Sequence, residues 1–150
     1  MCDYSLQHVA SAPARVGERL VTTEFRHSGT RGFTEIGAPE VAICLRPGSE
    51  LAFDGEVVFA DPTGLLPRRV KIAAGVARFR QVNVDQPYVH HDALEFPDGR
   101  LVMLTDLTPG QTATVLQLPA SSQPAEKRAA AEAPREAVEP LRETAPAPAI

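Results

Sequence analysis

The chain has 150 residues, of which 43% are hydrophobic and 23% are charged, and its formal net charge at pH 7 is -4. This composition is typical of one globular domain, and the acidic balance excludes the broad basic surface that attracts nucleic acid. The sequence lacks the run of about 20 apolar residues that a membrane-spanning helix needs. We therefore expect neither nucleic acid nor a membrane as a partner.

Short apolar runs separated by turn residues follow one another from Arg19 to Leu118, and no segment keeps a convincing 3.6-residue apolar period. The only helical candidates are short, such as Val70–Ala74. β-branched residues and bounding turn residues indicate strands. The predicted strands cover residues 19–25, 40–45, 51–53, 57–59, 76–84, 88–96, 101–105 and 112–118.

Two kinds of turn signal stand between these runs. Asp54-Gly55 lies between two apolar triplets, and Asp-Gly favours a tight hairpin turn in which both central residues have positive φ. Pro47-Gly48 and Pro109-Gly110 fit type II turns, because proline presets the first φ and glycine supplies a positive second one. Many short strands joined by such turns predict an all-β fold, a small single-domain barrel or sandwich of short antiparallel strands.

The composition changes at Pro119. Residues 120–150 are mostly Ala, Pro, Glu and Arg, with few large apolar side chains. Such a segment cannot bury enough apolar surface to offset the entropy of ordering. The sequence therefore predicts a β domain over residues 1–119 and a disordered tail over residues 120–150. The tail either keeps the protein solvated or binds a protein partner.

The densest cluster of reactive side chains is His90-His91-Asp92. If residues 88–96 form an extended strand, side chains alternate, so His90 and Asp92 share one face while His91 and Glu95 share the other. An imidazole and a carboxylate together suit zinc, iron or manganese. The plain alternative is that the two histidines straddle a strand, one hydrogen-bonded near the core and one solvated.

A metal site also needs ligands from elsewhere in the chain. The thiols of Cys44 and Cys2, or the imidazole of His8, are the candidates for the third ligand. The sequence therefore predicts a possible divalent-metal site, with zinc, iron or manganese, made from His90, His91, Asp92, Cys44 and Cys2.

The cysteines also bear on the location of the protein. The N-terminus lacks a basic segment followed by an apolar run, so we expect no secretory signal and a cytoplasmic protein. Thiols stay reduced there, so Cys2 and Cys44 are expected to be free. Removal of Met1 would give Cys2 the free α-amine of an N-terminal nucleophile, but such enzymes are larger layered α/β proteins. We predict no catalytic residue.

Two further segments carry charges that either bind an anion or lie on a solvated surface. Arg68, Arg69 and Lys71 form a basic stretch, with Arg78 and Arg80 farther along, that could contact an anionic ligand or an acidic partner. Residues 27–32 form a loop whose backbone amides and Arg31 could hold an anion. Phosphate-loop, serine-hydrolase and paired-cysteine zinc motifs do not occur in the sequence.

The opening hexapeptide, from Met1 to Leu6, and the run from Ala77 to Phe96 resemble a group of small bacterial proteins without a known activity. The resemblance covers the β domain and leaves out the tail. It implies no activity, cofactor or partner.

Three hypotheses for the function remain. The first is a non-enzymatic binding or accessory module, either with a metal held by the His/Asp/Cys cluster or without one. The second is a small cupin-like metalloenzyme, in which the same ligands leave a coordination position open for substrate. The third is a purely structural or interaction protein. A concave, partly apolar pocket beside the cluster would favour the enzyme over the others.

Overall fold

A computed structural model describes residues 8–26, 29–73 and 75–120. The chain divides into two units, Met1–Pro119 and Ala120–Ile150, and the predicted tail lies outside the described residues from position 121 onward. The first unit is built from strands, with the 3-10 turn η2 as the only helical element among the described residues. These elements are β1 (Ala10–Pro13), β2 (Arg19–Glu24), β3 (Arg31–Glu35), β4 (Ala38–Cys44), β5 (Glu50–Phe53), β6 (Val57–Asp61), β7 (Arg68–Ile72), β8 (Val76–Gln81), β9 (Asp92–Glu95), β10 (Leu101–Met103), η2 (Leu104–Asp106) and β11 (Thr112–Gln117).

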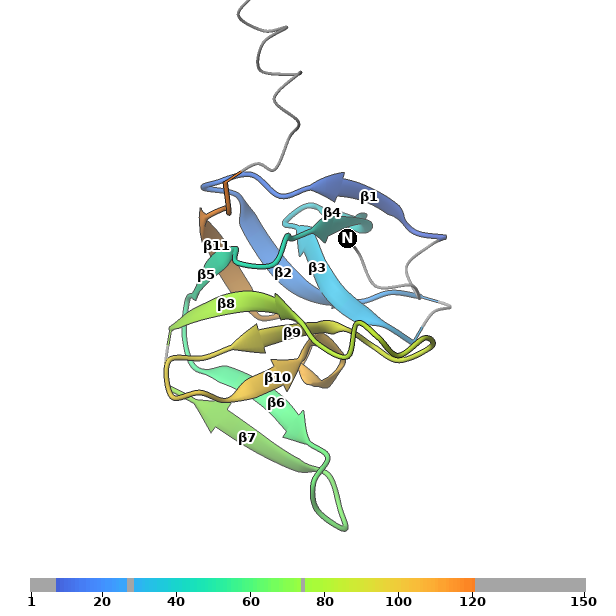
Figure 1. Ribbon diagram of the computed structural model, residues 1–150. Helices are drawn as coiled ribbons and strands as arrows, with labels where there is room; N and C mark the ends of the chain where they lie inside the picture. The colour runs from blue at the N-terminus through green and yellow to red at the C-terminus, as the bar shows by residue number, and fades with distance from the viewer. Residues whose placement is uncertain (1–7, 27–28, 74, 121–150) are drawn as a thin grey trace, which may run out of the picture. The chain divides into compact units, whose positions relative to one another are not determined.

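Nine of the strands form one mixed sheet in the order β1-β4-β3-β2-β11-β5-β8-β9-β10, and β6 and β7 form a separate two-stranded sheet (Figure 1). The all-β prediction is confirmed. Within the described residues the end strands β1 and β10 pair only with β4 and β9, so the sheet does not close into a barrel. The pairing of β1 with β4 is parallel, which departs from the predicted antiparallel arrangement. No helix in this described part is long and apolar enough to cross a membrane.

One hydrophobic core collects side chains from strands that lie far apart in the sheet. Leu20 on β2, Phe33 on β3 and Leu94 on β9 are all buried in the same cluster. The rings of Phe33 and Phe53 approach to a centroid distance of 6.3 Å. The sheet therefore curves so that distant strands share one core, and Figure 1 shows β8 and β9 below β2 and β3. Burial alternates along β2 and β8, as expected for strands with one inward face.

The proline-glycine turns adopt the backbone that the sequence predicts. Gly48 and Gly110 have φ values of 99° and 92°. The Ser49 N–H donates to the Arg46 carbonyl at 3.0 Å, which closes the turn between β4 and β5. Left-handed backbone at these positions favours glycine, because it has no Cβ.

The predicted Asp54-Gly55 hairpin is wrong. β5 pairs with β11 and β8, whereas β6 pairs with β7, so the two apolar triplets lie in different sheets. Neither Asp54 nor Gly55 has positive φ. Contacts with distant residues hold Asp54 in place instead. Its carboxylate accepts hydrogen bonds from Arg19 Nη1, at 2.8 Å, and from the Thr112 hydroxyl. Its backbone N–H donates to the Thr112 carbonyl at 3.0 Å.

The helical candidate at Val70–Ala74 is also wrong, because residues up to Ile72 belong to β7. β7 pairs antiparallel with β6 over five residue pairs, from Val57 opposite Ile72 to Asp61 opposite Arg68. The pairing places Ile72 opposite Val57, and both side chains are buried in the core. Together with β7, the strands β1 and β3 were not predicted, and β3 begins inside the loop expected at residues 27–32.

The β6–β7 hairpin is fastened to the main sheet at its base and projects from it (Figure 1). The side-chain amide of Gln111 pairs with the backbone of Val58 in both directions: Val58 N–H donates to Oε1 at 2.7 Å, and Nε2 donates to the Val58 carbonyl at 2.7 Å. The Thr108 N–H donates to the same carbonyl at 3.0 Å. The Gln111 side chain thus links the two sheets by hydrogen bonds like those between paired strands.

Candidate functional site

His90 and His91 lie in the connection between β8 and β9, before the strand that was expected to carry them. β9 begins only at Asp92, and Tyr88 has a left-handed φ of 65°. The prediction of an extended segment over residues 88–96 is therefore wrong for its first half. Two contacts close the connection: the Val82 N–H donates to the His91 carbonyl at 2.8 Å, and His91 Nδ1 lies 3.0 Å from the Val82 carbonyl.

The closed connection sets the contacts of His91 and Asp92. Because a carbonyl only accepts, His91 Nδ1 carries the proton in the contact with Val82. Asp92 lies opposite Gln81 in the ladder and accepts a hydrogen bond from its amide at 3.2 Å. Strict alternation of faces applies only from Asp92 onward, so it does not place His90 and Asp92 on one face.

His90 lies close enough to Asp106, at the end of η2, to influence its protonation. Burial raises the pKa of Asp106, the positive charges of Arg31 and His90 oppose that increase, and the carboxylate of Asp61 adds to it. This cluster could not be predicted from the sequence, since its members come from four separate segments.

The guanidinium of Arg31 contacts other groups of the protein. Nη1 donates to the carbonyls of Thr105 and Leu107 at 3.1 and 3.0 Å, and Nε lies 3.6 Å from Glu24. These contacts satisfy one carbonyl group within η2 and one directly after it. The structure therefore gives Arg31 a structural role where the sequence suggested an anion-binding loop.

Cys44, the last residue of β4, is disulfide-bonded. The expectation of a free thiol at this position is therefore wrong, and Cys2 lies outside the described residues. A disulfide sulfur is not a thiolate, which is the form of cysteine that binds metals. Cys44 and Asp92 nevertheless line the same cavity, together with Arg31 and Leu104, and its volume is about 20 Å³. That space holds roughly one water molecule.

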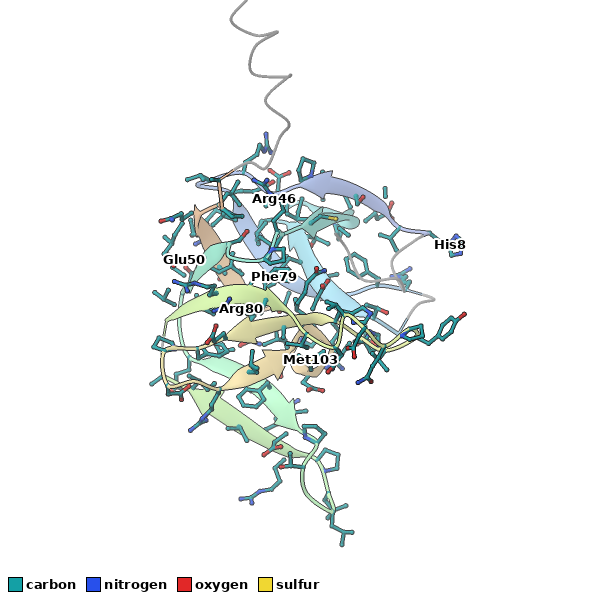
Figure 2. The ribbon with its side chains drawn as sticks, in the orientation of Figure 1. His8, Arg46, Glu50, Phe79, Arg80 and Met103 are labelled. Carbon is teal, nitrogen blue, oxygen red and sulfur yellow. The ribbon has the colours of Figure 1, made fainter. Side chains whose placement is uncertain are left out.

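His8 lies elsewhere, beside a groove of about 580 Å³ that Glu24, Arg26 and Glu40 also line. Figure 2 shows His8 at the outer edge, near the start of β1. Among the residues that the structure describes, no group of three or more His, Cys, Asp or Glu side chains could hold a metal ion. The structure thus brings Asp92 to Cys44 and His90 near Asp106, but it does not assemble the predicted ligand set from these residues.

The predicted basic stretch divides between two surfaces. Arg78 lies 2.9 Å from Glu50, and Arg80 lies 2.5 Å from Glu95, so both arginines form cross-strand ion pairs on β5, β8 and β9 (Figure 2). This half of the stretch is a solvated, charge-balanced face. Arg68, Arg69 and Lys71 lie on β7, beside the projecting loop of the hairpin.

The loop between β6 and β7 leaves two adjacent leucines in solvent. Leu65 is the most exposed large apolar side chain of the described residues, followed by Tyr88 at 84% in the connection between β8 and β9. Leu65 is 101% exposed and Leu66 is 74% exposed. In Figure 2 the side chains of this loop stand clear of the rest of the first unit. The sequence signal was present but not used: two adjacent leucines stand between Pro62 and Pro67, in a turn where polar residues are usual.

The charges around this loop are arranged unevenly. On β6, Asp61 accepts hydrogen bonds from the Thr63 hydroxyl at 2.6 Å and the Thr63 N–H at 2.9 Å. These bonds, with the charge of Arg68, lower the pKa of Asp61. At the base, Lys71 lies 3.3 Å from Glu56. The described structure gives Arg69 no such carboxylate partner.

Comparison with known proteins does not assign a function to the hairpin loop or to the cavity beside Cys44. No known protein family, curated protein or solved structure matches the chain. The function has to be inferred from the hairpin and from the cavity beside Cys44.

Proposed function

We propose that the chain is a non-enzymatic binding module and that the β6–β7 hairpin is its contact element. The observation that carries this proposal is the exposure of Leu65 and Leu66, 101% and 74%, at the end of the hairpin. Burying a leucine side chain stabilises by about 1.5–3 kcal/mol relative to leaving it in water. Two adjacent leucines that the fold leaves in solvent therefore offer a partner a substantial gain in free energy.

The hairpin is suited to this role because its base is held firmly. Val57, Phe59 and Ile72 are buried in the main core, and Gln111 bonds to both backbone groups of Val58. A support that is already ordered loses less conformational entropy when the tip binds. The apolar tip is thus presented on a stiff arm.

The cavity beside the cluster does not support an enzyme site there. Ligand sites usually measure about 300–1,000 Å³, whereas the cavity lined by Cys44 and Asp92 measures about 20 Å³. It has no room for a substrate. The cupin-like metalloenzyme is accordingly the weaker alternative.

A metal-dependent form of the module is the second candidate, because Asp92 and Cys44 share that cavity. Elemental analysis of reduced protein tests it. Zinc, iron or manganese at a whole-number ratio, lost in both His90→Ala and Cys44→Ala, would support this form. Metal-free protein, or metal retained in both variants, would contradict it.

The location and partners of the module are also proposals. A cytoplasmic protein was expected from the sequence, but the disulfide of Cys44 favours an oxidising environment. A protein partner for residues 121–150 and the exclusion of nucleic acid stay predictions from composition and charge.

A fluorescent probe on the hairpin tip tests the proposed function. Leu65→Cys and, as a matched control, Leu101→Cys on β10, where the leucine is 56% exposed, are labelled with an environment-sensitive fluorophore. In a concentrated extract of cells that produce the protein, emission is expected to shift to the blue at position 65 only. Equal shifts at both positions, or none at position 65, would contradict the proposal. The parent protein treated with the same reagent corrects for labelling at the native cysteines.

A further inference from the structure

The tip of the β6–β7 hairpin combines an apolar end with a basic flank. We infer that it docks on an anionic lipid surface, an inference that rests on the proposed function of the hairpin. Leu65 and Leu66 would enter the boundary between headgroups and acyl chains, and the basic side chains of β7 would meet the lipid phosphates.

The shape of the tip favours a lipid surface over a protein pocket. The two leucines stand at the end of a projecting arm and are exposed to solvent, and none of the four best-defined grooves of the described residues is lined by them. A protein partner would need a pocket matched to this convex end. A membrane interface accepts an apolar projection of any outline, because its acyl chains adapt to it.

The spacing along β7 would place the arginine charges at the depth of the lipid headgroups. Strand residues rise about 3.3 Å each, so Arg68 and Arg69 lie within about 10 Å of Leu66. Apolar faces of interfacial segments reach roughly 5–10 Å into the membrane boundary. With the leucines inserted to that depth, the arginines lie at the level of the headgroups.

The acidic groups on the hairpin do not cancel this arrangement. Residues 56–72 contain three basic side chains, Arg68, Arg69 and Lys71, and two acidic ones, Glu56 and Asp61. Asp61 stays negatively charged, because the hydrogen bonds from Thr63 and the charge of Arg68 lower its pKa. Glu56 pairs with Lys71 at the base, away from the tip. The farther carboxylate of Asp106 interacts with Asp61 but also with Arg31 and His90. Arg68 and Arg69 against Asp61 leave the outer end of the hairpin with a net charge of one positive unit.

This local charge differs from that of the whole chain. The expectation of no membrane partner came from the absence of a spanning segment and from a formal net charge of -4, which averages over all 150 residues. Screening limits electrostatic attraction to about 8 Å at physiological ionic strength. The charges next to the inserted tip therefore matter more than the total.

Vesicle co-sedimentation tests the inference on the full-length protein. The vesicles consist of phosphatidylcholine alone or of equal parts phosphatidylcholine and phosphatidylglycerol. The wild type is expected to bind only the anionic vesicles, and more weakly as salt increases. Leu65→Ser with Leu66→Ser, and separately Arg68→Glu with Arg69→Glu, should each lower the bound fraction about tenfold or more.

Leu101→Ser is the matched control, since it removes an exposed leucine from β10 and should bind like the wild type. Thermal melting of each variant shows that it is folded. The inference is overturned if the wild type ignores anionic vesicles, if the double serine variant binds them equally well, or if light scattering shows that the tip instead joins two copies of the chain.

The labelled Leu65→Cys protein separates this inference from the proposed function. An emission shift with lipid-free extract but none with vesicles would overturn the lipid inference and leave the hairpin as a protein-binding element. Absence of a shift with both would contradict the proposed function itself.

Discussion

His91 shows how one residue of an apparently reactive pair can serve the fold. Its ring and its backbone carbonyl both contact Val82, and together they close the connection between β8 and β9. The adjacent pair His90-His91 could be found in the sequence, but this closure could not, because it depends on a loop that brings residues 82 and 91 together. The hydrogen bond of His91 agrees with one part of the plain alternative, but neither histidine lies in a strand, as that alternative expected.

Replacement of His91 tests this role. His91→Ala should lower the free energy of unfolding by about 1 kcal/mol, because the Val82 carbonyl loses its donor. His91→Asn is the matched variant, since its side-chain amide can donate from nearly the same position as Nδ1, and it should recover much of the loss. Chemical denaturation measures both. Equal destabilisation by the two variants would mean that the hydrogen bond is not what stabilises the connection.

Asp54 is a second residue whose role is set by distant partners. Hydrogen bonds from Arg19 and Thr112 lower its pKa from 3.8 to about 2. Because the pKa of the folded state is below that of the unfolded chain, the contribution of Asp54 is present above pH 3.8 and is lost as the pH falls toward 2.

Carboxyl-carbon NMR of Asp54 checks this directly, with an expected midpoint near pH 2. In Asp54→Asn, the unfolding free energy should lose the part of its acid dependence that lies between pH 3.8 and about 2. A midpoint at the ordinary aspartate value in the wild type would show that the Arg19 pair does not persist in solution.

At the level of elements, the β6–β7 hairpin depends on a side chain that behaves like backbone. Gln111 accepts from the Val58 N–H and donates to the carbonyls of Val58 and Thr108. Its loss leaves partly buried backbone groups without these partners, which costs more than a solvent-exposed hydrogen bond.

We therefore expect Gln111→Ala to cost about 2 kcal/mol of unfolding free energy and to increase amide hydrogen exchange in β6 and β7 more than in β2 or β3. Gln111→Glu keeps the acceptor for Val58 but loses both donated bonds, so its effect should lie close to that of alanine. Unchanged exchange in the hairpin of both variants would show that the buried apolar base alone holds it.

The sequence predicted elements best where local chemistry decides the structure. The Pro47-Gly48 and Pro109-Gly110 turns and the alternating strand β8 required no knowledge of the rest of the chain. Asp54-Gly55 failed because tertiary partners occupied the carboxylate and the backbone donor. Three strands were missed: β1 and β3 carry no long β-branched run, and β7 overlaps the short helical candidate at Val70–Ala74.

At the level of the whole molecule, composition predicted the fold class but not the surface that we propose to be functional. Strand order cannot be read from local patterns, since β11, the last strand, lies between β2 and β5. Net charge is likewise an average, and it concealed the basic flank of one hairpin. Leu65 and Leu66 read as two more apolar residues until the structure showed that they do not join the core.

The same scale explains the fate of the predicted metal site. Cys44 and Asp92 are 48 positions apart in the numbering of the chain and do line one cavity. The disulfide of Cys44 and the small volume of that cavity leave little for a metal or a substrate there. The sequence could therefore predict that Cys44 and Asp92 come together. It could not predict that Cys44 forms a disulfide, which decides whether its sulfur can bind a metal.

The most direct test of the account is the solvent exposure of the hairpin tip in the unmodified protein. Hydroxyl-radical footprinting with mass spectrometry measures the oxidation rate of each leucine. Leu65 and Leu66 should oxidise at nearly the rate found in the unfolded chain, while Leu51 and Leu94, buried in the core, should be protected. Protection of Leu65 and Leu66 to the same degree as Leu51 would show that the tip is already covered, and it would contradict the proposal that this tip is available to a partner.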